Sequence, residues 1–138
     1  MIKKGQEKKT VLVVEDDRSL RAALSGRLRR EKYHVAEAKN GAEGLKRAKE
    51  MHPNVIVVDV AMPILDGITV IRRVREEGVW GKNVPIIILT NVSSEYVSPH
   101  IRMAENICFI IKAEHTVKEV TRIIQECLTK KVRAETKT

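Results

Sequence analysis

Aromatic residues are scarce in this chain of 138 residues: they make up 3% of it and are Tyr33, Trp80, Tyr96 and Phe109. A binding site of stacked aromatic side chains, as in many proteins that bind single-stranded nucleic acids, is therefore not expected. No apolar run approaches the roughly 20 residues that a membrane-spanning helix needs. The first ten residues, MIKKGQEKKT, also lack the apolar segment of a secretory signal.

Cysteine is rare, and the histidines are scattered. The two cysteines, Cys108 and Cys127, lie within apolar patterns, and we interpret them as buried, reduced thiols. The four histidines show no spacing that is typical of a metal site. Together with the missing signal, this composition predicts a cytoplasmic protein without a zinc site or a disulfide framework.

Positive charge is in excess, but it is concentrated at the two ends of the chain. The net charge is +8, of which residues 1–10 and 129–138 carry +3 each. Charge runs at chain ends are typical of solvated tails, so we do not expect nucleic-acid binding as a main role. We predict a flexible basic N-terminal tail over 1–10, one domain over 11–128, and a basic extension of the last helix or a tail over 129–138.

Between these tails, apolar strand-like runs alternate with segments of helical periodicity. Runs that are apolar on both faces favour a parallel sheet covered by helices on each side. Right-handed crossovers then give an open, doubly wound α/β sheet with five strands and about five helices. Strands are predicted at 11–15, 33–38, 55–60, 86–90 and 107–111, and helices at 19–31, 40–50, 68–78, from 99, and 116–132.

Two predicted helix boundaries depend on particular residues. The third helix is expected to end near Gly78, with a turn over 81–83 before the next strand. Proline is unfavourable inside a helix but suits its first position, so Ser98 is expected to cap a short fourth helix that begins at Pro99. A longer, kinked helix is the competing interpretation of this segment.

Polar residues stand at the ends of four predicted strands. In an open parallel sheet, ligands bind beyond the carboxyl ends of the strands, so these side chains are candidates for one site. Some have structural interpretations as well: Asp17 suits a cap of the first helix, and Thr90 could be a simple strand-end hydroxyl. The candidates are Glu15, Asp16, Asp59, Thr90 and Lys112.

Carboxylates that converge at one edge repel one another. At ~5 Å and an effective dielectric constant of ~20, each pair costs about 3 kcal/mol. A divalent cation removes this cost, and with Lys112 it makes the site of Glu15, Asp16 and Asp59 neutral. Oxygen ligands favour Mg²⁺, or Mn²⁺, over zinc. Such a site suits phosphoryl transfer, in which an aspartate can accept the phosphoryl group as an acyl phosphate.

Four segments, VLVVEDD, IVVDVAMPILDG, PIIILT and FIIK, resemble the successive motifs of bacterial response-regulator receiver domains. The resemblance covers about residues 11–128. The block DVAMPILDG is its most specific part, because Asp59, Met62-Pro63 and Asp66-Gly67 keep the spacing of that family. The resemblance implies a flavodoxin-like five-stranded sheet of order 2-1-3-4-5.

The resemblance also implies a role for each candidate residue. Asp59 matches the phosphoacceptor, and Glu15 and Asp16 match the acidic pair that holds Mg²⁺ together with it. The backbone carbonyl of Ala61 matches a further metal ligand. Thr90 matches the hydroxyl that contacts the phosphoryl group, and Lys112 matches the lysine that neutralises it. As in the family, Thr90 and Phe109 would act as switch residues, and the fourth helix, fifth strand and fifth helix would form the responding surface.

The chain departs from the family pattern at several positions. Proline usually follows the lysine, often through a cis peptide, whereas Ala113 follows Lys112 here and predicts a trans bond or a shifted loop. Asn91 replaces a small residue and could crowd the phosphate entrance or form a hydrogen bond there. An alanine-glycine turn is replaced by residues 104–106. Ala61 and Val92 cannot polarise a water molecule, which predicts slow self-dephosphorylation.

These observations favour a stand-alone receiver of a two-component system or phosphorelay. It would take a phosphoryl group from a histidine kinase or a histidine phosphotransfer protein and signal to an unknown protein partner, without being a metabolic enzyme or contacting a membrane. The main alternative is a degenerate receiver that acts as a phosphorylation-independent interaction module, for which Asn91 and Ala113 are the motive. A phosphatase with an aspartate nucleophile fits poorly, because position 15 is Glu and no cap domain is expected. A small basic nucleic-acid-binding protein is the fourth alternative.

The first helix is unusually basic. Five arginines lie within 18–30, on a segment expected near the acidic site. They could meet an acidic partner or could simply form a solvated face. The five are Arg18, Arg21, Arg27, Arg29 and Arg30.

Overall fold

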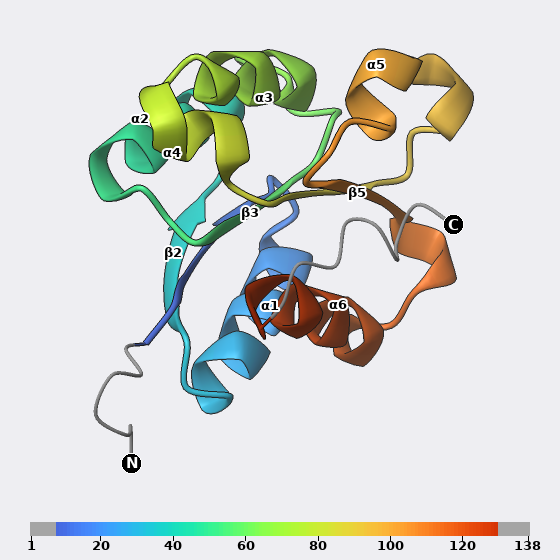
Figure 1. Cartoon of the computed structure of the whole chain (residues 1–138). Coiled ribbons are helices and arrows are strands. Elements are labelled where there is room, and N and C mark those ends of the chain that lie inside the picture. The colour runs from blue at the N-terminus through green and yellow to red at the C-terminus, as the bar shows by residue number, and fades with distance from the viewer. Residues whose placement is uncertain (1–7, 130–138) are drawn as a thin grey trace.

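The computed structural model describes residues 8–129 as one five-stranded parallel sheet in the order β2-β1-β3-β4-β5. This is the doubly wound topology that the sequence predicts (Figure 1). The strands are β1 (Thr10–Val14), β2 (His34–Ala38), β3 (Val55–Val58), β4 (Ile86–Thr90) and β5 (Ile107–Ile111). The helices are α1 (Arg18–Arg30), α2 (Gly41–Met51), α3 (Gly67–Arg75), α4 (Gly78–Asn83), α5 (Pro99–Arg102) and α6 (Val117–Thr129), with 3₁₀ turns η1 (Ser94–Tyr96) and η2 (Lys112–Glu114).

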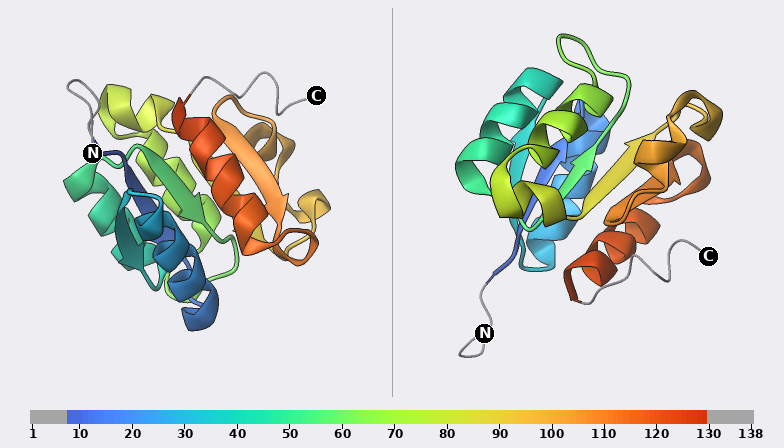
Figure 2. Two further views of the ribbon diagram at one scale, coloured as in Figure 1. Left: turned by 90° about the horizontal axis from the view of Figure 1, so that it is seen from below. Right: turned by 45° about the horizontal axis from the view of Figure 1, so that its top comes forward.

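The sheet separates two apolar cores. Helices α2, α3, α4 and α5 cover one face, and α1 and α6 cover the other (Figures 1 and 2). Successive side chains of a strand point to opposite faces. In β1, Leu12 and Val14 therefore enter the core under α2 and α3, while Val11 and Val13 enter the core under α1 and α6. This explains why the central strands are apolar at every position rather than at every second one.

Side-chain caps begin several helices where the sequence predicts them. Asp17 accepts a hydrogen bond from the backbone of Leu20 at the start of α1. Asn40 caps α2 in the same way. Ser98 caps α5, and Pro99 is its first residue, so the short fourth helix of the sequence prediction is confirmed. The preceding segment contains only the 3₁₀ turn η1.

The segment after α3 differs from the prediction. We expected a turn over 81–83, but the chain forms the helix α4, which brings the described α-helices to six rather than about five. Gly78 makes this possible with a φ of 65°, a left-handed conformation that favours glycine. A Cβ atom at Gly81 would lie 2.0 Å from the carbonyl oxygen of Val74, so this glycine serves close packing, not a turn. The guanidinium of Arg75 closes α4 by donating to the Gly81 carbonyl.

Both cysteines are free, as expected, but they are half-buried rather than buried. Burial raises the pKa of both thiols, that of Cys127 to about 12. They are therefore protonated and poorly reactive at neutral pH. Within residues 8–129, no helix is long and apolar enough to cross a membrane.

The predicted basic tails fall almost wholly outside the described residues, which exclude 1–7 and 130–138. The described part begins two residues before β1, and α6 continues to the last described residue, Thr129. The proposed tail boundaries remain predictions.

Candidate functional site

The acidic residues lie where the strand order reverses. Strands β1 and β3 are neighbours although β2 lies between them in sequence, and ligands of such sheets bind at this switch point, beyond the carboxyl ends. Glu15 directly follows β1, and Asp59 directly follows β3. The Asp59 amide still donates to the Val14 carbonyl at 3.3 Å, so the ladder of hydrogen bonds between the strands reaches the site itself.

Three carboxylates gather at this point. Glu15, Asp16 and Asp59 each offer an oxygen atom, and these oxygens all lie within 4.8 Å of one another. Glu15 and Asp59 are 2% and 5% exposed, whereas Asp16 is open to solvent. Two buried acids and one exposed acid form a site that a hard cation could enter from solvent and that offers it only oxygen ligands.

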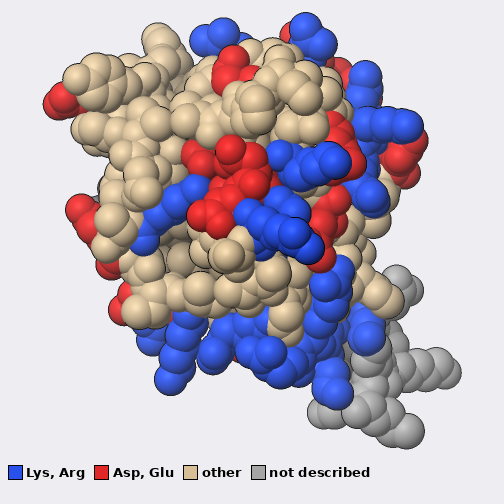
Figure 3. Space-filling model, turned by 180° about the vertical axis from the view of Figure 1, so that it is seen from behind, with Lys and Arg blue, Asp and Glu red and all other residues tan. Residues whose placement is uncertain are grey.

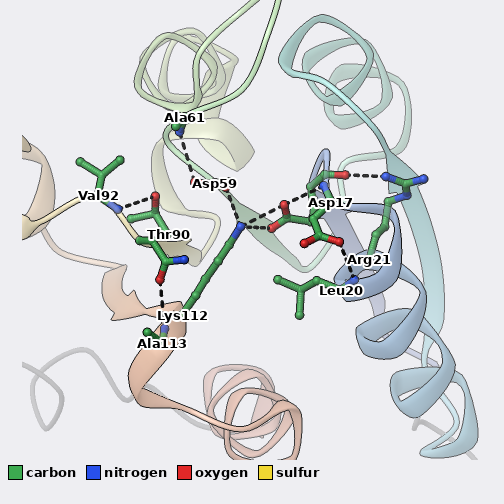
Figure 4. Close-up of polar contacts among 11 residues, drawn as sticks. Asp17, Leu20, Arg21, Asp59, Ala61, Thr90, Val92, Lys112 and Ala113 are labelled. Carbon is green, nitrogen blue, oxygen red and sulfur yellow. Dashed lines mark hydrogen bonds and ion pairs between the residues drawn. The ribbon is translucent and has the colours of Figure 1, made fainter.

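Lys112 lies between the two buried acids (Figure 4). Its Nζ atom is 2.7 Å from Oδ2 of Asp59, and 2.9 Å from Oε1 and 3.0 Å from Oε2 of Glu15. The lysine follows β5 at the edge of the sheet, so its side chain extends past the end of β4 to reach them. The contacts leave the group of three acids and one lysine with a formal charge of −2, which a divalent cation would cancel.

The protonation of Glu15 and Lys112 reflects their burial and their ion pair. Burial raises the pKa of Glu15 above its ordinary value, and this outweighs the opposing hydrogen bonds from Lys112 and the Asp17 amide. Burial would lower the pKa of Lys112, but the hydrogen bonds to Asp59 and Glu15 outweigh it, so the pKa of Lys112 is raised. The lysine is therefore charged at neutral pH.

The DVAMPILDG segment forms the loop that presents Asp59. The Ala61 amide donates to Oδ1 of Asp59 at 3.2 Å, which fixes the carboxylate from the side opposite Lys112 (Figure 4). Asp66 caps α3 by accepting from the Thr69 amide at 2.9 Å. A Cβ atom at Gly67 would lie 2.0 Å from the Asp59 carbonyl oxygen, so only glycine allows α3 to begin so close to the site. Ligation of a metal by the Ala61 carbonyl remains a prediction.

The two predicted switch residues have different surroundings. Thr90 ends β4 and is fully buried, and its hydroxyl oxygen accepts from the Val92 amide at 3.2 Å. The hydroxyl proton thus remains available to another acceptor. Phe109 lies on β5, half-buried against the core under α3 and α5. These positions are compatible with a linked movement, which remains a prediction.

Asn91 and Ala113, which both depart from the family pattern, contact each other. The Ala113 amide donates to Oδ1 of Asn91 at 3.0 Å. No cis peptide bond occurs among residues 8–129, so the bond between Lys112 and Ala113 is trans, as predicted. The sequence analysis places both positions at the same edge of the sheet, but no pattern in the sequence indicates that the Ala113 amide and the Asn91 side chain would form a hydrogen bond.

The basic face of α1 is largely engaged within the molecule. Arg21 pairs with Glu37 at 3.3 Å and donates to the Glu15 carbonyl at 2.7 Å, so it also supports the acidic site. Arg29 pairs with Glu37, and Arg27 pairs with Glu31. Within the described part of the chain, Arg18 and Arg30 form no ion pair. The support that Arg21 gives to Glu15 was missed, because the sequence shows only a run of arginines.

The surface carries both signs of charge side by side. Seen from behind, a compact group of acidic side chains lies next to basic ones, and a broader basic area lies below it (Figure 3). An anionic ligand approaching the acids would therefore meet nearby positive charge that offsets their repulsion.

Comparisons with known proteins agree with this geometry. The chain is 42% identical over 84 residues to the transcriptional regulatory protein PrrA of Mycobacterium tuberculosis. This match covers 61% of this chain and 35% of that protein. It is 39% identical over 88 residues to the alkaline phosphatase synthesis transcriptional regulatory protein PhoP of Bacillus subtilis, covering 64% and 35%. The chain thus spans about a third of the length of these curated relatives.

Solved structures share the fold. The chemotaxis response regulator CheY4 of Vibrio cholerae superposes with a TM-score of 0.76 and 28% identity, covering 88% of this chain and all of that one. The response regulator receiver domain family matches residues 11–125, which include every candidate residue of the site. The chain therefore belongs to the response regulator receiver domain family of two-component systems.

Proposed function

We propose that this protein is a phosphorylation-controlled signalling switch that accepts a phosphoryl group on Asp59. The donor is a phosphohistidine of a histidine kinase or of a histidine phosphotransfer protein. The observation that carries the proposal is the contact of Lys112 with both buried acids, because it brings a permanent positive charge to Oδ2 of Asp59. A buried nucleophilic carboxylate beside a lysine suits an incoming phosphoryl group.

In the transfer, an Asp59 oxygen forms a bond to phosphorus while the nitrogen–phosphorus bond of the donor breaks. The electron pair returns to the imidazole nitrogen, which takes up a proton. Lys112 offsets the charge of the phosphoryl oxygens, and the Ala61 amide holds the other carboxylate oxygen in place. Thr90 can donate its hydroxyl proton to a phosphoryl oxygen, since its oxygen already accepts from Val92.

Glu15, Asp16 and Asp59 are the residues that would hold Mg²⁺, and Mn²⁺ could replace it. The fit follows from the donor set, which consists of carboxylate oxygens within 4.8 Å of one another. When bound, the ion supplies positive charge that offsets the carboxylates and the phosphoryl group.

The output of the switch is a change in the surface formed by α5, β5 and α6. In the sequence prediction these were the fourth helix, fifth strand and fifth helix; the numbers differ because α4 is an additional helix. We propose that a cytoplasmic protein partner reads this surface and that the receiver itself turns over no metabolite. The relatives are named transcriptional regulators, and the matches cover about a third of them, so action as a stand-alone receiver is also part of the proposal.

The decisive experiment exposes the purified protein to a small phosphodonor such as phosphoramidate, with Mg²⁺ or with EDTA, and records intact mass. Wild type should gain one phosphoryl group only with Mg²⁺, and Asp59→Asn should gain none. Asp66→Asn is the matched control, since Asp66 caps α3 outside the acidic cluster and asparagine keeps the capping oxygen. A phosphorylated Asp59→Asn, or an unmodified wild type, would contradict the proposal.

The alternative, a phosphorylation-independent interaction module, rested on Asn91 and Ala113. Ala113 was expected to shift the loop beside Lys112, and Asn91 to crowd the phosphate entrance or to form a hydrogen bond there. The ion pairs of Lys112 and the bond between Asn91 and Ala113 instead support the phosphoacceptor function.

A further inference from the structure

One hydrogen bond connects the two loops that carry the groups facing Asp59. Asn91 directly follows Thr90, at the end of β4, and Ala113 directly follows Lys112, at the end of β5. The Ala113 amide donates to Oδ1 of Asn91 at 3.0 Å, between positions 22 residues apart (Figure 4). A single side chain therefore ties the backbone beside the lysine to the backbone beside the threonine.

The bond uses a donor that the sheet does not satisfy. Strand β5 ends at Ile111, and the 3₁₀ turn η2 that follows is closed by the His115 amide donating to the Lys112 carbonyl at 3.3 Å. The Ala113 amide has its hydrogen bond with Asn91 instead. Without that side chain, the amide would turn to water, and the first turn after β5 would lose its tie to β4.

This tie bears directly on the position of the lysine ammonium. A lysine side chain has four rotatable bonds, so its Nζ atom is well placed only if the backbone beneath it is fixed. Lys112 must span to two acids on other strands, at 2.7 Å from Asp59 and 2.9 Å from Glu15. Holding the neighbouring peptide is thus a way to hold the ammonium at Asp59.

We propose that Asn91 is a positioning residue that keeps Lys112 aligned with Thr90 during transfer of the phosphoryl group to Asp59. The inference rests on the proposed function. Asn91 itself touches neither Asp59 nor the acidic cluster among the described contacts; it acts through the Ala113 amide. Its loss should slow phosphorylation by about two- to tenfold, the range expected for one hydrogen bond between uncharged groups.

The test compares Asn91→Ala, Asn91→Asp and wild type with phosphoramidate as donor over a series of Mg²⁺ concentrations. In Asn91→Ala the maximal rate should fall while the half-saturating Mg²⁺ concentration and the melting temperature stay unchanged, because the acidic cluster is intact. Hydrogen exchange of the Ala113 amide should accelerate. Asn91→Asp keeps an acceptor oxygen and should recover the rate. Asn83→Ala is the matched control, since Asn83 donates to the Val79 carbonyl at 2.8 Å on α4, away from the site.

The possible results distinguish failure of the proposed function from failure of the role of Asn91. An unmodified wild type would overturn the proposed function itself. A phosphorylated wild type with an unchanged rate in Asn91→Ala would overturn only the role of Asn91. That role would also fall if the maximal rate, the half-saturating Mg²⁺ concentration and the melting temperature all shifted together, since this is the mark of a general loss of structure. Equal slowing in Asn91→Ala and Asn91→Asp, with unchanged exchange at Ala113, would overturn it as well.

Discussion

The half of the site on β1 and β3 and the half on β4 and β5 are held together differently. The acidic half is fixed by backbone: the Glu15 amide donates to the Ala38 carbonyl at 3.0 Å, and the Asp59 amide to the Val14 carbonyl. Gly67 packs directly against the Asp59 carbonyl. In the other half the pairing of the strands ends at Thr90 and Ile111, and beyond it the contacts are made by side chains, namely the reach of Lys112 and the bond from Ala113 to Asn91.

This difference assigns separate tasks to the two halves. Carboxylates on a rigid frame can present a ligand set of constant geometry to a cation, because nothing has to rearrange when it binds. Side chains on short loops can move as the charge at Asp59 changes, which a switch requires. Changes in the β4–β5 half should therefore alter rates, whereas changes to the backbone frame of the β1–β3 half that leave its acids in place should alter the stability of the fold.

After loss of Asp59 itself, removal of the charge of Lys112, which joins the two halves, should have the largest effect on the rate of phosphorylation. Lys112→Met keeps an unbranched side chain one atom shorter but removes its charge, so phosphorylation of Asp59 should slow by about a hundredfold or more. Lys118→Met is the control. Lys118 is exposed on α6, so this substitution removes the same charge at a position away from the site. The rate of mass gain with phosphoramidate and Mg²⁺ measures both. Similar rates for Lys112→Met and wild type would show that the lysine does not act on Asp59.

The lifetime of the phosphorylated state is a further test of the β4–β5 half of the site. Hydrolysis of an acyl phosphate needs an oriented water molecule, and neither Ala61 nor Val92 can polarise one. Val92 packs against the apolar core instead. We expect slow loss of phosphate from wild type, and about tenfold faster loss from Val92→Gln, with Val92→Ala unchanged. Decay is followed by mass after removal of the donor, and a wild-type half-life of seconds would contradict this expectation.

Much of the frame could be predicted because its causes are local in sequence. Five apolar runs gave the strands, and a capping residue gave the start of α1, α2 and α5. Polar residues that end such runs must gather at one edge of a parallel sheet, so the sequence alone predicts that Glu15, Asp59 and Lys112 lie close together. The structure confirms this prediction, since the side chain of Lys112 contacts those of Glu15 and Asp59.

The remaining features depend on contacts between distant residues. Gly81 reads as a turn residue, and only its packing against the Val74 carbonyl explains why it lies in a helix. Arg21 reads as one arginine among five, until its bonds to Glu37 and the Glu15 carbonyl are seen. Side-chain partners of this kind leave no periodic pattern, so propensity and spacing cannot reveal them.

The smallest expected effect is on stability. It concerns Asp66, which caps α3 beside the acidic half of the site. Asp66→Ala removes the acceptor of the Thr69 amide and should lower the free energy of unfolding by about 1 kcal/mol at pH 7. The hydrogen bond from the Thr69 amide lowers the pKa of Asp66 below its ordinary value of 3.8. A carboxyl with a lowered pKa in the folded state stabilises the fold above 3.8 and loses this contribution as the pH falls through its folded pKa.

The difference in stability between wild type and Asp66→Ala should therefore be constant from neutral pH down to about pH 5 and should narrow below about pH 4. Asp66→Asn keeps an uncharged acceptor, so its stability relative to Asp66→Ala should not change with pH. Urea unfolding at several pH values measures all three proteins. The phosphorylation rate of Asp66→Ala should stay within about twofold of wild type, because the backbone contacts of Asp59 remain. A much larger loss of rate would mean that the acidic half depends on its side chains as strongly as the β4–β5 half, and the contrast between them would fail.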